Sequence, residues 1–125
     1  FFFDRMPFAE PASQVLSFCE NKQVEGYITP VICSNVYYML CKISNHKTVI
    51  NKVQMLLSFI GVLGMDATVV RNALISDFND FEDALQYYSA VNDNSIDIIL
   101  TRNVKDYKRS NISVMTPEIY LQNKI

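Results

Sequence analysis

The fold is decided by the stretch from Ile96 to Arg109, which reads IDIILTRNVKDYKR. Its first five residues, ending at Leu100, form a short apolar run rich in β-branched side chains, and this run predicts the strongest strand of the chain. Polar and charged residues follow it at once. Because ligands of open parallel sheets bind at the carboxyl ends of the strands, functional side chains are expected directly after Leu100.

Elements on both sides of this strand alternate between helix and strand. Apolar residues at helical spacing predict helices at 8–23, 30–43, about 47–58, 66–74, about 80–88 and from 117 onward. Short apolar runs between breakers predict further strands at 24–28, 61–65 and 112–115. The pairs Thr29-Pro30 and Thr116-Pro117 each have the form of a helix N-cap followed by proline at the first helical position. The alternation predicts an α/β fold with a largely parallel sheet.

Length and composition restrict the class of protein. The chain has 125 residues, which fits one domain spanning 1–125. Half of the residues are hydrophobic and 19% are charged, so the chain is not intrinsically disordered. Eleven Lys and Arg residues against 13 Asp and Glu give a net charge of −2, which excludes a strongly basic nucleic-acid binder but not a local basic patch.

Cysteine usage and hydropathy favour a cytoplasmic protein. The three cysteines are an odd number without Cys-x-x-Cys spacing, so a disulfide framework or zinc ribbon is not expected. Neither a membrane-spanning segment nor a signal peptide is visible. The chain lacks a Gly-rich phosphate loop, so a dinucleotide cofactor is not expected. It opens with Phe1-Phe2-Phe3 and no initiator Met, as a fragment or a mature portion of a longer protein would.

The loop after Leu100 is the first candidate site. It carries four of the chain's 11 basic residues around a single carboxylate, that of Asp106. These are Arg102, Lys105, Lys108 and Arg109. One interpretation is a metal-binding or acid–base aspartate flanked by side chains that contact phosphate. The other is a solvated loop of mixed charge.

Two further features lie upstream. The segment from Asp77 to Asp83 has four acids in seven residues, whereas helix capping and the helix dipole require only one or two of them. Asn35 lies on the apolar stripe of its predicted helix, three residues after Ile32 and four before Met39. It is either a buried residue that bonds neighbouring backbone or a residue that faces a polar site shared with the acids.

Two motifs together resemble the PIN domain family, the nuclease fold of VapC-type toxins in bacterial toxin–antitoxin pairs. They are FNDFEDALQYYSA at 78–90 and DIILTRNVKDY at 97–107. GYITP at 26–30, YYML at 37–40 and VMTPE at 114–118 also resemble the family. The resemblance covers essentially the whole chain. It implies a three-layer α/β/α fold with a short, mostly parallel central sheet.

The resemblance also implies an activity. Family members are metal-dependent ribonucleases in which three or four acids hold one or two Mg²⁺ or Mn²⁺ ions that activate water for attack on a phosphodiester. By this likeness Asp83 and Asp106 are the catalytic, metal-ligating acids. Asn35, Thr101 and Asn103 are the supporting polar residues. Arg102, Lys105, Lys108 and Arg109 are the expected contacts to RNA phosphates.

This sequence departs from the family pattern at two positions. The family's first acid ends a central strand that would lie upstream of Phe1, so the chain is expected to lack its first strand. Phe1–Phe3 are then expected to lead from that strand into the first helix. The second acid, usually Glu, falls at Asn35, which offers an oxygen without charge. With two of the usual acids, metal affinity and nuclease activity are expected to be weak.

Two classes of function follow. The first is an RNA-cleaving enzyme, with an antitoxin protein as partner and a homodimer as its form, both by resemblance. The second is a catalytically impaired domain that binds RNA or a protein. A receiver-like signalling domain is a weaker third alternative, because the paired acids that such a domain needs at its strand ends are not found.

Overall fold

A computed structural model shows an all-parallel sheet flanked by helices. It describes residues 2–3, 10–101, 104–107 and 110–123. Five strands make up the sheet in this part of the chain, in the order β3-β2-β1-β4-β5. They are β1 (Phe2–Phe3), β2 (Gly26–Ile28), β3 (Ile60–Val62), β4 (Ile98–Leu100) and β5 (Ser113–Met115). Every neighbouring pair is parallel, so the carboxyl ends of the strands meet at one edge.

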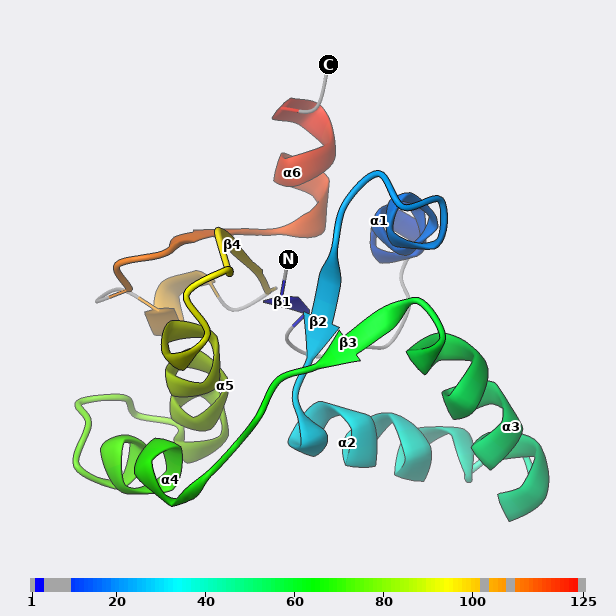
Figure 1. Cartoon of the computed structure of the whole chain (residues 1–125), viewed down its shortest axis with the longest axis horizontal. Coiled ribbons are helices and arrows are strands. Elements are labelled where there is room, and N and C mark those ends of the chain that lie inside the picture. The colour runs from blue at the N-terminus through cyan, green and yellow to red at the C-terminus, as the bar shows by residue number, and fades with distance from the viewer. Residues whose placement is uncertain (1, 4–9, 102–103, 108–109, 124–125) are drawn as a thin grey trace.

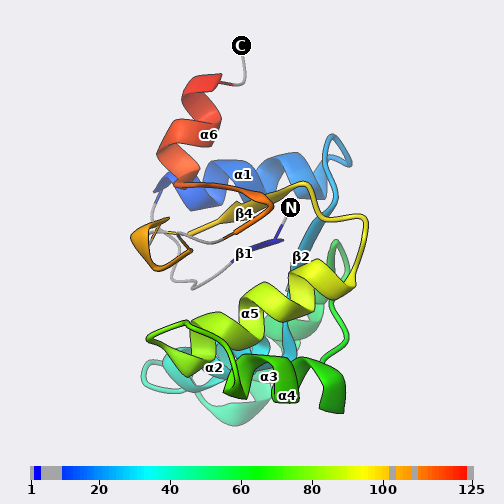
Figure 2. The ribbon, with the colours of Figure 1, turned by 90° about the vertical axis from the view of Figure 1, so that its left-hand side faces the viewer.

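The helices form two layers, one on each face of the sheet. Those of the described residues are α1 (Glu10–Glu20), α2 (Pro30–Leu40), α3 (His46–Leu57), α4 (Ala67–Leu74), α5 (Phe81–Asn92) and α6 (Pro117–Asn123), with a 3₁₀ turn η1 (Val104–Tyr107). Figure 1 shows the strands between the helices, and Figure 2 shows α1 and α6 above the sheet and α2 to α5 below it. The predicted three-layer α/β/α fold with a parallel sheet is therefore confirmed. No helix in the described part of the chain is long and apolar enough to cross a membrane.

The centre of the sheet corrects one expectation. Phe2–Phe3 do not lead from a missing strand into the first helix but form β1 themselves. Phe2 is in register with Tyr27 of β2 and with Ile99 of β4. Without β1, the inner edges of β2 and β4 would present unpaired backbone groups in the middle of the sheet, and such groups are costly when buried. Two residues are too short a run for hydrophobic patterning to identify as a strand.

The helix starts agree closely with the predicted caps. Thr29 Oγ1 accepts a hydrogen bond from the Ile32 amide at 3.2 Å, with Pro30 at the first helical position. Asp66, the first residue of the predicted helix at 66–74, also acts as a cap, because its Oδ1 accepts from the Val69 amide at 3.0 Å. Thr116 Oγ1 accepts from the Ile119 amide at 3.2 Å. Each cap satisfies an amide that has no partner inside its helix, which is why the Thr-Pro and Asp signals place these starts correctly.

Burial differs from the predicted stripes at two positions. The apolar stripes of the predicted helices at 30–43 and about 80–88 place Ile43 and Phe81 on inward faces. Instead, Ile43 lies beyond the end of α2 and is 81% exposed, and Phe81 is 48% exposed. In α5 the buried face instead carries Asp83, Gln86 and Ser89 beside apolar residues. Helical periodicity alone misplaces this face, because it cannot foresee that Gln86 is buried by a hydrogen bond to Thr29 at the end of β2.

Gly61 allows β3 to lie close to the Tyr27 ring on β2. These two residues are in register, and a Cβ at position 61 would lie 2.7 Å from Tyr27 Cδ1. Gly61→Ala is therefore expected to lower the free energy of unfolding by about 1–3 kcal/mol, the usual cost of overpacking. Urea denaturation of Gly61→Ala, Tyr27→Ala and the double variant measures this effect. If the ring clash is the cause, the double variant loses less stability than the sum of the single variants; strict additivity would contradict it.

Candidate active site

The carboxyl edge of the sheet brings α5, α2 and η1 to one region. α5 runs back from this edge to the start of β4, so its first turn lies at the carboxyl ends of the strands. α2 starts at the same edge because it follows β2 after a single residue, and η1 follows β4. The sequence motifs at 78–90 and 97–107 therefore meet in space because the connections of an all-parallel sheet bring them to one edge.

Asp83 is the buried acid of this region. It lies in the first turn of α5, its side chain is 0% exposed, and its backbone amide donates to Asp80 Oδ1 at 3.0 Å. Asp80 is therefore the N-cap of α5. A carboxylate in the first helical turn is stabilised by the positive end of the helix dipole. Burial of a charge is otherwise costly, so this environment favours an acid that serves as an ion ligand or a hydrogen-bonding centre.

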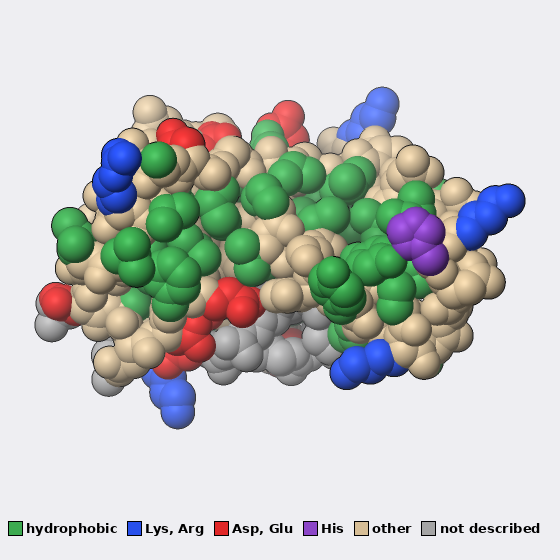
Figure 3. All heavy atoms as spheres, turned by 90° about the horizontal axis from the view of Figure 1, so that it is seen from below, with side chains coloured by type: hydrophobic (Ala, Val, Ile, Leu, Met, Phe, Trp, Pro, Cys, Tyr) green, Lys and Arg blue, Asp and Glu red, His purple; other side chains and the backbone are tan. Residues whose placement is uncertain are grey.

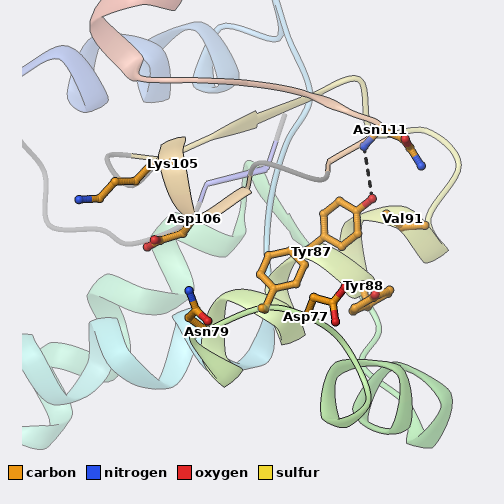
Figure 4. Close-up of a pocket in the computed structure, with 9 residues that line it drawn as sticks. Asp77, Asn79, Tyr87, Tyr88, Val91, Lys105, Asp106 and Asn111 are labelled. Carbon is orange, nitrogen blue, oxygen red and sulfur yellow. Dashed lines mark hydrogen bonds between the residues drawn. The ribbon is translucent and has the colours of Figure 1, made fainter.

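Asp106 is the exposed acid. It lies in η1, directly after β4, and lines a cavity of about 830 Å³ together with Lys105 (Figure 4). Asn79, from the loop before α5, lines the same cavity. η1 packs against α5, and the Tyr107 ring lies 5.7 Å from the Phe78 ring, centroid to centroid. The structure therefore brings Asp106 and the start of the acidic segment 77–83 to one cavity, although Asp83 itself does not line it.

Asn35 faces the acids. Its Nδ2 donates to Glu82 Oε1 at 2.9 Å, and its side chain is exposed. Of the two alternatives from the sequence, a buried Asn bonded to backbone is therefore wrong, and contact with the acidic segment is confirmed. Glu82 is the residue that sequence reasoning missed as the partner of Asn35. The sequence signal was present as an acid beyond the needs of capping, but only tertiary structure shows which acid faces α2.

A buried polar pair lies beneath this surface. Thr29 Oγ1 donates to Gln86 Oε1 at 2.5 Å, and both side chains are 0% exposed. Thr29 ends β2 and caps α2, whereas Gln86 lies one turn after Asp83 on α5. This bond links the two helices that carry Asn35 and Glu82. Hydrophobic periodicity cannot identify such a pair, because it treats a buried glutamine as a surface residue.

The remaining predicted site residues lie in different environments or outside the described part of the chain. Thr101 is buried, and its amide donates to Met115 O at 3.0 Å across the sheet. Lys105 is exposed at the cavity. Arg102, Asn103, Lys108 and Arg109 lie outside the described residues. In the chain, Asp4 follows β1 directly, and it also lies outside the described residues.

Carboxylate oxygens, which several side chains of this region carry, are the ligand type that a small divalent cation prefers. Mg²⁺ binds through one or two carboxylates, completing its shell with waters and substrate phosphates. Asp83 lies on α5 and Asp106 on η1, two elements in contact, and Glu82 precedes Asp83 in the chain. No group of three or more His, Cys, Asp or Glu side chains arranged to hold a metal is found among the described residues. Figure 3 shows a small group of acidic side chains near the middle of the face that it presents.

Comparison with known proteins adds a family to this geometry. No match is found among curated proteins. The family model described as PIN domain matches residues 1–105. This range includes β1 to β4 and the start of η1, and it contains Asn35, Glu82, Asp83 and Thr101. Because the match spans most of the chain, this protein is a member of the PIN domain family.

Proposed function

We propose that this protein is a metal-dependent endoribonuclease that hydrolyses RNA phosphodiesters. PIN domains are generally nucleases, which supports the class of reaction. The observation that carries the proposal is the convergence of α5 and η1 at the carboxyl edge of the parallel sheet. This convergence brings together the two elements that bear Asp83 and Asp106.

In this proposal Asp83 and Asp106 would hold Mg²⁺ or Mn²⁺, which when bound would supply the means to activate water and to stabilise charge on the phosphate. Thr101 and Asn103 support the site as polar neighbours of the β4 end. Lys105 lies at the cavity beside Asp106, where an ammonium group attracts a phosphate. Arg102, Lys108 and Arg109 extend this positive charge along the RNA backbone.

The biological setting that we propose is that of a VapC-type toxin. The protein would then be the toxin of a type II toxin–antitoxin pair, act in the cytoplasm as a homodimer and be bound by an antitoxin protein. The three cysteines are free thiols, as a reducing compartment requires.

Incubation of the purified protein with single-stranded RNA tests the activity. We expect cleavage in the presence of Mn²⁺ or Mg²⁺, loss of cleavage on addition of EDTA, and recovery when Mn²⁺ exceeds the chelator. Cleavage that EDTA does not change would contradict the metal dependence. Intact RNA at every Mn²⁺ concentration, with protein shown to be folded by circular dichroism, would contradict the enzyme.

A second function is favoured by Asn35, which stands where the family usually has an acid. If that loss of charge abolishes metal binding, the domain acts as a binding module for RNA or a protein. RNA binding without cleavage in the same assay would support this alternative, and metal-dependent cleavage would exclude it.

The Asn35–Glu82 hydrogen bond bears directly on that choice. We propose that Glu82 supplies the carboxylate that position 35 lacks, with Oε1 held by the Asn35 amide. Glu82→Gln is then expected to weaken Mn²⁺ binding about tenfold, which is typical for loss of a group that supports a metal site. Isothermal titration with Mn²⁺ measures the effect without relying on activity.

The matched control is Glu20→Gln, which removes an exposed acid from α1 on the opposite face of the sheet. The double variant Asn35→Glu, Glu82→Gln moves the carboxylate to α2 and is expected to recover Mn²⁺ binding. Unchanged Mn²⁺ affinity in Glu82→Gln would show that this carboxylate plays no part in the site.

A further inference from the structure

The cavity beside Asp106 extends well beyond the acids. Its other walls come from the loop before α5, from α5 itself and from the segment before β5. In Figure 4 Lys105 and Asp106 lie toward one end, and Asn111 and Val91 lie toward the other. At about 830 Å³ it falls within the size range of small-molecule pockets. Binding of a metal ion and one phosphate at Asp106 would leave most of this volume unused.

Aromatic rings line part of the cavity. Phe78 and Tyr88 line it, and their ring centroids lie 6.2 Å apart, whereas Tyr87 lies 5.1 Å from Tyr88. Phe78 and Tyr88 are half-buried, so each ring keeps part of its surface accessible. RNA-binding proteins bind unpaired bases by stacking them on such rings.

Two side-chain amides line the same cavity. Asn79 and Asn111 are exposed, and neither side-chain amide makes a hydrogen bond with the described residues. Tyr87 Oη accepts from the backbone amide of Asn111 at 3.3 Å, which fixes the backbone while leaving the side chain available. Carboxamides offer a donor and an acceptor together, which is the pattern that pairs with the edge of a base.

We infer that this cavity is a subsite for one unpaired RNA base next to the phosphate bound at Asp106. The base stacks on the Tyr88 ring, the Phe78 ring lies at 63° to that ring, and the edge of the base faces Asn79. The inference rests on the proposed ribonuclease function and adds a requirement to it. The nucleotide in the subsite must be single-stranded, because a base inside a duplex is stacked on both faces and is not free to stack on a protein ring.

Fluorescence of 2-aminopurine tests the stacking. A short single-stranded RNA that carries one 2-aminopurine is titrated with the protein in EDTA, so that no metal-dependent cleavage occurs. We expect the 2-aminopurine fluorescence to be quenched on binding. Tyr88→Phe, which keeps the ring, should bind the RNA like the original protein, and Tyr88→Ala should bind it about fivefold to a hundredfold more weakly. An RNA of the same length with an abasic site in place of 2-aminopurine is measured as a competitor of the fluorescent RNA. It should bind the original protein more weakly than the intact RNA does, and Tyr88→Ala should weaken its binding little further.

Asn79→Ala provides a second variant that does not disturb packing, since its side chain is exposed. It is expected to weaken binding of the intact RNA but not of the abasic RNA. If both variants bind intact and abasic RNA as the original protein does, the subsite is wrong, and the same holds if the protein binds no RNA. Quenching that depends on Tyr88, without cleavage in Mn²⁺, would support the subsite and contradict the nuclease. Cleavage that neither Tyr88→Ala nor Asn79→Ala changes would support the nuclease and contradict the subsite.

Discussion

Replacing Asp106 with asparagine is expected to lower Mn²⁺-dependent RNA cleavage by about a hundredfold or more. That loss corresponds to about 2.7 kcal/mol of transition-state stabilisation. The physical reason is that asparagine keeps the size and one oxygen of aspartate but removes the charge that attracts a divalent ion. A bound metal contributes several kcal/mol of charge stabilisation in phosphoryl chemistry, so a loss of this size is well within its contribution.

The exposure of Asp106 makes this variant easy to interpret. Its side chain lies at the surface of η1, so the free energy of unfolding should change by less than about 0.5 kcal/mol. Asp97→Asn is the matched control, because it removes another exposed acid, just before β4. Full cleavage by Asp106→Asn, at the rate of Asp97→Asn, would contradict a catalytic role for Asp106.

Replacing Ile99 with alanine is expected to lower the free energy of unfolding by about 2–5 kcal/mol. Ile99 is 0% exposed in β4, where it pairs with Phe2 of β1 and Val114 of β5. The variant removes buried methyl and methylene groups and leaves a cavity that neighbours on two sides of the sheet fill only in part. For a domain of this size the loss is a large fraction of total stability.

Urea denaturation followed by circular dichroism measures this effect. Ile43→Ala makes the same chemical change at a side chain that is 81% exposed, and it should cost less than about 0.5 kcal/mol. Ile99→Val, which removes one methylene, is expected to fall between the two at about 0.5–1.5 kcal/mol. Equal stability of Ile99→Ala and Ile43→Ala would show that β4 does not form the centre of the core.

Local signals in the sequence were reliable where the physics is local. The Thr29, Asp66 and Thr116 caps bond amides three residues ahead, so their effect is readable from neighbouring letters. The strand predicted at 96–100 is found at Ile98–Leu100, because its apolar, β-branched residues suit a strand buried on both faces. Hydrophobic patterning misplaced Phe81, because the elements that pack against α5 decide which face of this helix points inward.

The candidate site was recognised in part from the sequence. Asp83 and Asp106 could be proposed because their motifs resemble those of a known family, and the match to the PIN domain model confirms the family while their roles remain proposals. Glu82 could not be selected from four nearby acids, since its significance comes from Asn35, which lies 47 positions away. The pair of Thr29 and Gln86 escaped notice for the same reason, with a separation of 57 positions.

By itself, the sequence determined the α/β alternation, the helix starts, the strongest strand and the acidic and basic segments, because each depends on residues that are close together in the chain. Only the tertiary structure decided that Phe2–Phe3 complete the centre of the sheet, that Asn35 donates a hydrogen bond to Glu82, and that Asp106 lines a cavity together with aromatic rings. These features arise from contacts between segments distant in the chain. They depend on strand order and helix packing, which bring α2, α5 and η1 to one edge of the sheet.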